Sequence, residues 1–207
     1  MCSSDLDSHH DAIAVDFPTS CPSVQHDFNV AVASMHNMTY AIARNQFKQI
    51  IQKDPTCGMA HWGVGMTYIH PLWGDNPSPK IMADGSTRVA TARASTLSER
   101  EQAYVEALAA YYDNAELELY ERLKVFAKAM KDVHLAYPDD LEAKAFHAVT
   151  HLSTMPPGTV DLDVIDHASK MAFEVLDQPE HLRVVLLDLL VAVHANGRGR
   201  NTGVAAA

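Results

Sequence analysis

The sequence predicts an all-α fold made of stacked helical hairpins. Apolar residues recur at three- and four-residue spacing within residues 43–51, which places them on one face of a helix: Ala43, Phe47, Ile50 and Ile51. Asp54-Pro55 ends this helix, because proline lacks a backbone N–H and disfavours the α conformation in the residue before it. A second helical pattern begins at once. We interpret residues 43–68 as the second helix of one hairpin, a tight turn, and the first helix of the next.

The other helices can be placed from their caps and periodicity. Pro22 suits the first turn of a helix, and Ser98 with Glu101 three residues later forms a capping box. Residues 69–79 contain three prolines and a glycine, which predicts an inserted loop. The expected helices around this loop cover approximately residues 23–38, 80–94, 98–112, 115–137, 141–152 and 160–176.

Six positions in the central stretch have the spacing of the tetratricopeptide repeat (TPR), a helix–turn–helix unit of about 34 residues. Their side chains match its small, aromatic and proline positions and then the Leu, Gly and Tyr positions of the next repeat: Ala43, Phe47, Pro55, Val64, Gly65 and Tyr68. The interval from Pro55 to Pro138 is too long for two regular repeats. This resemblance therefore implies an irregular right-handed stack of TPR-like hairpins, an α-α superhelix.

A narrower resemblance rests on six short segments in a fixed order. They are FPTSC, DPTCGMAHWGVGM, HPLW, LSEREQAYVEALAAYY, YPDD and QPEH, between Phe17 and His181. In this order they resemble a group of uncharacterised bacterial TPR-like proteins. The resemblance implies a helical repeat fold and, because such proteins often carry export signals, a periplasmic or secreted location. It implies little about activity.

We expect the repeat domain to cover residues 14–194. Residues 1–13 are expected to be a disordered, non-native leader, since MCSSDL at the start looks like a sequencing adapter read in frame. Residues 195–207, rich in Gly, Arg, Asn and Ala, are expected to form a disordered tail. The chain as given shows no signal peptide and no apolar run long enough to span a membrane. An incomplete array would leave an apolar face uncovered, so homodimerisation through the C-terminal helices is a further expectation.

Charge and composition restrict the class of partner. The formal net charge of −10 argues against nucleic acid, because phosphate binding requires clustered Lys and Arg. A hydrophobic content of 47% with 20% charged residues is typical of a folded globular domain. A protein or peptide is the expected partner.

Two cysteines, Cys21 and Cys57, each precede the first helix of a hairpin. In a TPR-like stack these helices run side by side in the same direction, so a disulfide can form if the Cα atoms come within about 7 Å. Two buried free thiols are the alternative.

Histidine and tryptophan side chains are concentrated near the first hairpins and the inserted loop. The candidates for binding a ligand or partner are His36, His61, Trp62, His70 and Trp73. Neutral imidazole binds zinc, copper or nickel, so His36, His61 and His70 are also candidate metal ligands. The structural alternative is that these imidazoles hydrogen-bond the loop and hold Trp73 against the stack.

A weaker metal candidate is the pair His147 and His151, at the i, i+4 spacing of one helix face. The alternative is that both histidines are simply polar residues of a surface or groove and bind no metal. No nucleophile motif or phosphate-binding loop is present, and Glu99, Glu101 and Glu106 are interpreted as a solvated helix face.

Two functions follow as hypotheses. The first is a TPR-like scaffold that binds protein or peptide, without catalytic activity or cofactor of its own. The alternative is a metal-binding or metal-dependent protein that uses the histidines near the first hairpins.

Overall fold

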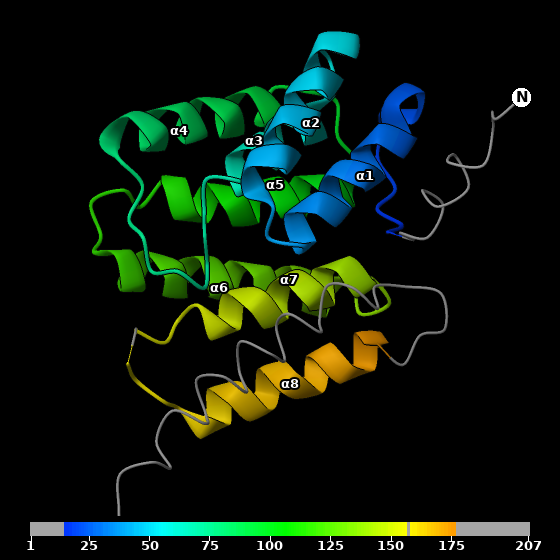
Figure 1. The fold of residues 1–207 in the computed structure, drawn as a ribbon. Helices are drawn as coiled ribbons and strands as arrows, with labels where there is room; N and C mark the ends of the chain where they lie inside the picture. Colours follow the sequence, from blue (N-terminus) through cyan, green and yellow to red (C-terminus); the bar gives the residue numbers. More distant parts are fainter. Residues whose placement is uncertain (1–14, 157, 177–207) are drawn as a thin grey trace, which may run out of the picture.

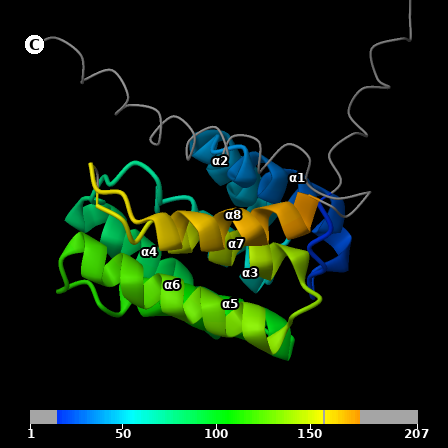
Figure 2. The same ribbon diagram turned by 90° about the horizontal axis from the view of Figure 1, so that it is seen from below.

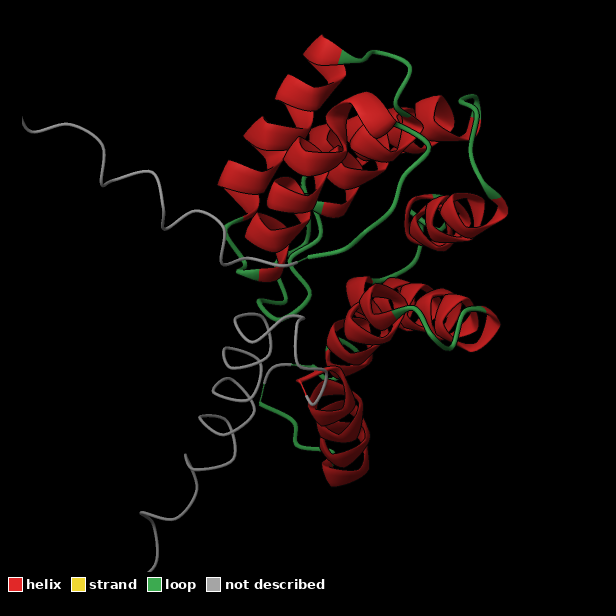
Figure 3. Ribbon diagram, turned by 90° about the vertical axis from the view of Figure 1, so that its right-hand side faces the viewer, coloured by secondary structure: helices red, strands yellow, loops and turns green. Residues whose placement is uncertain are grey.

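The computed structural model describes residues 15–156 and 158–176. This part of the chain contains eight α-helices, one short 3-10 helix and no strand (Figures 1 and 3). In order these are η1 (Pro22–Val24), α1 (Gln25–His36), α2 (Tyr40–Lys53), α3 (Gly58–Met66), α4 (Pro79–Arg93), α5 (Glu99–Tyr112), α6 (Leu119–Ala136), α7 (Leu141–Leu152) and α8 (Leu162–Leu176). The predicted all-α class is confirmed.

Helices that follow one another in the sequence pack against one another, from α1 and α2 through to α7 and α8. Helix α8 lies at one end of the stack (Figure 1), and the view from below shows it in front of α7, against which it packs (Figure 2). Contacts also join α1 to α3 and α3 to α5. The odd-numbered helices therefore share one interior surface.

The predicted helices are present, with shifted ends. Helix α2 begins at Tyr40, three residues before the apolar periodicity at Ala43. The periodicity does not reveal this first turn, because its residues Ala41 and Ile42 are exposed. Helix α6 begins at Leu119, since residues 113–116 form a turn. The capping box is confirmed, with Ser98 and Glu101 bonded to each other's backbone N–H.

The core is an aromatic cluster between the odd-numbered helices. Trp62 of α3 packs against Tyr104 of α5 and Phe146 of α7, at ring-centroid distances of 5.7 Å each. Phe28 of α1 stacks 6.5 Å from Trp62. These side chains are buried, so the surface where the odd-numbered helices meet is filled by their own aromatic rings.

The extended segment before η1 belongs to this core. Phe17 is fully buried, 4.9 Å from the ring of Tyr104, and the guanidinium of Arg100 lies 4.4 Å from its ring centre. Ser20 donates its backbone N–H to Glu101 Oε1 at 2.7 Å, and its hydroxyl also bonds to the same carboxylate. The interpretation of Glu101 as part of a solvated face is therefore wrong: it is buried, because it joins the N-terminal segment to the start of α5.

A disulfide joins Cys21 and Cys57, whose Cα atoms lie 5.6 Å apart. It links the N-cap of η1 to the N-cap of α3. Both cysteines are buried. The alternative of two free thiols does not describe this structure.

Within the described residues, no helix is both long enough and apolar enough to cross a membrane. The expectations for residues 1–13 and for residues 195–207 lie outside the described residues. The expected homodimer through the C-terminal helices stays a prediction.

Candidate functional site

A groove of about 510 Å³ lies between the start of α2 and the loop after α3. We call it the Tyr40–Trp73 groove. Its lining combines apolar and aromatic side chains with one cation: Met38, Thr39, Tyr40, Ala41, Ile42, Arg44, His70 and Trp73. Trp73 and Ile42 are each 55% exposed. Large apolar side chains around a hollow are typical of a binding site for another molecule.

The backbone at the groove edge has an unusual conformation. Met38, between α1 and α2, has a φ of 58°, in the left-handed region that non-glycine residues seldom adopt. Such a conformation costs on the order of 1 kcal/mol and persists only where the surrounding structure holds it. It places the flexible Met38 side chain in the lining of the groove and of the cavity beside it.

That adjoining cavity is smaller and more enclosed, with a volume of about 30 Å³. Methionine, aromatic and aliphatic side chains from α1, α3, α6, α7 and the loops after α1 and α3 line it: Met35, Met38, Met66, Ile69, Phe126, Phe146 and Val149. Methionine adapts its shape readily, so a lining of this kind can adjust to differently shaped apolar groups. His36 is on the wall of this cavity.

His36 does not lie free in the cavity. Its Nε2 is 2.6 Å from Glu142 Oε2 of α7, and its ring stacks on Phe146 at 4.7 Å. Both members of the pair are buried. His36 therefore fixes α1 against α7.

His70 organises the loop wall of the groove. Its ring stacks on Tyr40 at a centroid distance of 4.7 Å and meets Trp73 edge-on at 6.3 Å. Its Nδ1 lies 2.7 Å from Asp75 Oδ2 of the same loop. Burial, followed by the charge of Asp75, raises the pKa of Tyr40. The expected role of imidazole in holding the loop and Trp73 is seen at His70.

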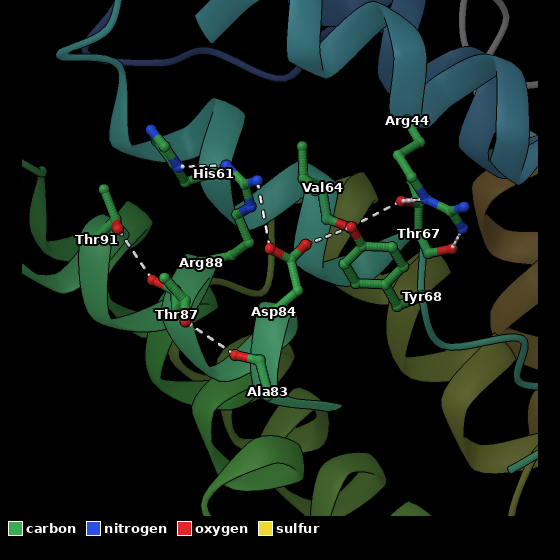
Figure 4. Close-up of polar contacts among 10 residues, drawn as sticks. All are labelled: Arg44, His61, Val64, Thr67, Tyr68, Ala83, Asp84, Thr87, Arg88 and Thr91. Carbon is green, nitrogen blue, oxygen red and sulfur yellow. Dashed lines mark hydrogen bonds and ion pairs between the residues drawn. The ribbon is translucent and has the colours of Figure 1, made fainter. Parts of the chain in front are cut away.

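His61 lies in a third environment, in the polar network of Figure 4. Its Nδ1 is 3.5 Å from Arg88 Nη1, and Arg88 Nη2 donates to Asp84 Oδ1 at 3.4 Å. Burial, with a smaller contribution from the charge of Arg88, lowers the pKa of His61. A neutral imidazole is thus held beside a cation on the α3 and α4 side of the molecule.

The same network reaches α2 through Tyr68. The Tyr68 hydroxyl is hydrogen-bonded to Asp84, and burial together with that bond raises the pKa of Tyr68 to about 12. Arg44 lies 4.5 Å from the Tyr68 ring centre and donates to Thr67 Oγ1 at 3.1 Å and to its carbonyl at 2.6 Å (Figure 4). The guanidinium of Arg44, a residue that lines the groove, is therefore held in place.

The sequence candidates are divided among these places. His70 and Trp73 meet at the groove, and His36 lies on the neighbouring cavity. Trp62 is a core residue whose indole N–H donates to the Tyr104 carbonyl at 3.2 Å. Tyr40 and Ile42 were not among the predicted candidates, although an aromatic and a large aliphatic residue at the start of an amphipathic helix are a usable signal.

The metal candidates do not assemble as predicted. His36, His61 and His70 contact Glu142, Arg88 and Asp75 respectively, on three different elements. As the side chains stand in residues 15–156 and 158–176, no three His, Cys, Asp or Glu residues are arranged to hold a metal ion.

The weaker pair is part of a larger group. The ring centroids of His147 and His151 are 5.9 Å apart, and His167 of α8 lies 6.0 Å from His147 and 5.2 Å from His151. His134 of α6 is 5.6 Å from His147. Only the pair on α7 is visible in the sequence, because the other members come from α6 and α8.

Comparisons with models of protein families, with curated proteins and with solved structures found no match.

Proposed function

We propose that this protein is a TPR-like helical scaffold that binds a peptide or an extended segment of another protein in the Tyr40–Trp73 groove. The observation that carries the proposal is that two large, exposed apolar side chains, Trp73 and Ile42, line the same hollow. Tryptophan and tyrosine, when they line a pocket, supply much of the binding energy of protein interfaces.

Preorganisation of the groove supports this function. His70 is fixed by Tyr40 and Asp75, and Arg44 is fixed by Thr67. A wall that is ordered before binding loses little side-chain entropy on binding, which increases affinity. The adaptable methionines of the adjoining cavity suit the end of an apolar side chain that enters from the groove.

Charge indicates the chemistry of the partner. The chain has a formal net charge of −10, so its overall field attracts basic segments. The expected ligand has a large apolar or aromatic anchor flanked by Lys or Arg. The Cys21–Cys57 disulfide supports a role in an oxidising compartment, such as the periplasm or the outside of the cell.

Selection from a random peptide display library tests the proposal, followed by titration calorimetry with the enriched peptides. We expect enrichment of an apolar anchor with basic neighbours. Trp73→Ala and Ile42→Asp should each weaken binding at least tenfold, a loss of about 1.4 kcal/mol. The fluorescence of Trp73 provides a second measurement of peptide binding, because burial of its indole by the peptide should shift the emission to shorter wavelength.

Phe173→Ala provides the matched control. Phe173 is an aromatic side chain on α8 that is 53% exposed, almost as exposed as Trp73, and it is no part of the groove lining. Its removal should leave peptide affinity unchanged. Peptides that bind the Trp73→Ala variant as tightly as the unaltered protein would refute the proposed site.

A further inference from the structure

We propose that His147, His151 and His167 form a binding site for one transition-metal ion on the surface shared by α7 and α8. The site uses residues other than those of the Tyr40–Trp73 groove, and it does not depend on peptide binding. Its ligands would be three neutral imidazoles, a donor set that suits zinc, copper or nickel.

Ring spacing is the first support for this site. Imidazole nitrogens that bind a tetrahedral zinc ion lie about 2.0–2.1 Å from the metal, which places the ring centres roughly 5 Å apart. The three ring-centroid distances here are 5.2, 5.9 and 6.0 Å. The rings thus form a triangle that is slightly wider than a bound ion requires.

The backbone provides this triangle. His147 and His151 are one turn apart on α7, so both lie on the same helix face. Packing of α8 along α7 brings His167 to that face. Ligands on two packed helices are held more precisely than ligands on a loop.

An unpartnered buried nitrogen is the second support. His147 is 3% exposed, and its Nδ1 is buried without a hydrogen-bond partner. A buried polar atom of this kind ordinarily has a partner, since leaving it unpaired costs about 1–3 kcal/mol. An ion bound between the three rings would give His147 a polar partner, with its ring turned as binding requires.

Two features oppose binding. The rings must turn to converge, because they are not set for an ion as they stand. His151 is only half-buried and His167 is exposed, so both have room to rotate. The positive charge of Lys131 also acts on this cluster, but its exposed ammonium is screened by water and salt.

Titration with Zn²⁺ alone, in competition with a coloured chelator, tests the site on the full chain. The measurements use a His9→Ala, His10→Ala background, because two adjacent histidines near the N-terminus can bind metal by themselves. We expect one equivalent of tightly bound zinc. Co²⁺ in place of zinc should give the visible absorption of a tetrahedral site.

His167→Ala is the principal variant, because an exposed side chain can be removed without disturbing the core, and circular dichroism checks that the fold is kept. Its zinc affinity should fall at least tenfold, as should that of His151→Ala. His26→Ala, which removes an exposed histidine on α1, is the control and should leave the zinc affinity unchanged. Absence of a one-equivalent site, or equal affinity in His167→Ala and His26→Ala, would overturn the proposal.

Discussion

Nε2 of His36 on α1 lies 2.6 Å from Oε2 of Glu142 on α7, across 106 positions of the sequence and in the interior of the molecule. The two helices are separated by five others in the chain. The pair therefore connects the beginning of the helical stack to its later part.

His36→Ala should destabilise the protein by about 3–5 kcal/mol, because it leaves Glu142 buried without its partner. Urea unfolding followed by circular dichroism measures the loss. The double variant His36→Phe, Glu142→Leu removes both polar groups and fills the space, so it should recover most of the stability. A single variant as stable as the unaltered protein would mean that the pair contributes little.

Reduction of the Cys21–Cys57 disulfide should lower stability by about 3–4 kcal/mol. The bond closes a loop between residues 36 positions apart, and the loss of that constraint increases the entropy of the unfolded chain. The measurement compares thermal unfolding of the Cys21→Ser, Cys57→Ser variant with that of the oxidised protein. A reducing agent should lower the thermal unfolding midpoint of the oxidised protein and leave the midpoint of the variant unchanged.

Gly63→Ala should destabilise α3. A Cβ at this position would lie 2.4 Å from Cε1 of Phe47, a fully buried ring with little room to move. Overpacking of this kind costs typically about 1–3 kcal/mol, which exceeds the gain of about 1 kcal/mol in helix propensity. Chemical denaturation measures the difference. Asn45→Ala, at an exposed position of α2, is the control and should be nearly neutral.

Stability should decrease in acid partly because of Glu101. Burial alone would raise the pKa of its carboxyl group, but hydrogen bonds from Ser20 and Ser98 outweigh burial and lower it. A carboxylate with a lowered folded-state pKa stabilises the fold above its unfolded-state pKa of about 4.3. That contribution is lost as the pH falls through the lower, folded-state value.

The Glu101→Gln variant tests this linkage. It keeps the side-chain shape but carries no charge, so its unfolding free energy should be lower at pH 7 and should change less between pH 5 and pH 3. Glu99→Gln, on the exposed face of the same helix turn, provides the comparison. Parallel pH profiles for Glu101→Gln and the unaltered protein would exclude Glu101 as a source of the acid sensitivity.

Local signals were sufficient for most of the fold. The Asp54-Pro55 break, the Ser98–Glu101 capping box and the helix ending before Pro138 depend on residues near one another in the chain, and each is found in the structure. The sequence pattern failed at Glu101, whose second partner, Ser20, lies 81 positions away. Helical periodicity could not show that a charged residue on α5 would be covered by the segment before η1.

The candidate sites were less predictable for the same reason. Trp73 and His70 could be selected from the composition of the inserted loop, but their partner Tyr40 comes from α2. The i, i+4 pair of His147 and His151 was visible, whereas His167 reaches it only through the packing of α8 on α7.

The sequence by itself determined the helical class, the helix order and most helix ends, because caps, prolines and apolar spacing act over a few residues. Only the tertiary structure decided which side chains meet: His36 with Glu142, Phe17 with Trp62 and Tyr104, and three histidines from α7 and α8. Such contacts depend on the angles and offsets at which helices pack. Those are set by the combined shape of many buried side chains, which no local pattern in the chain contains.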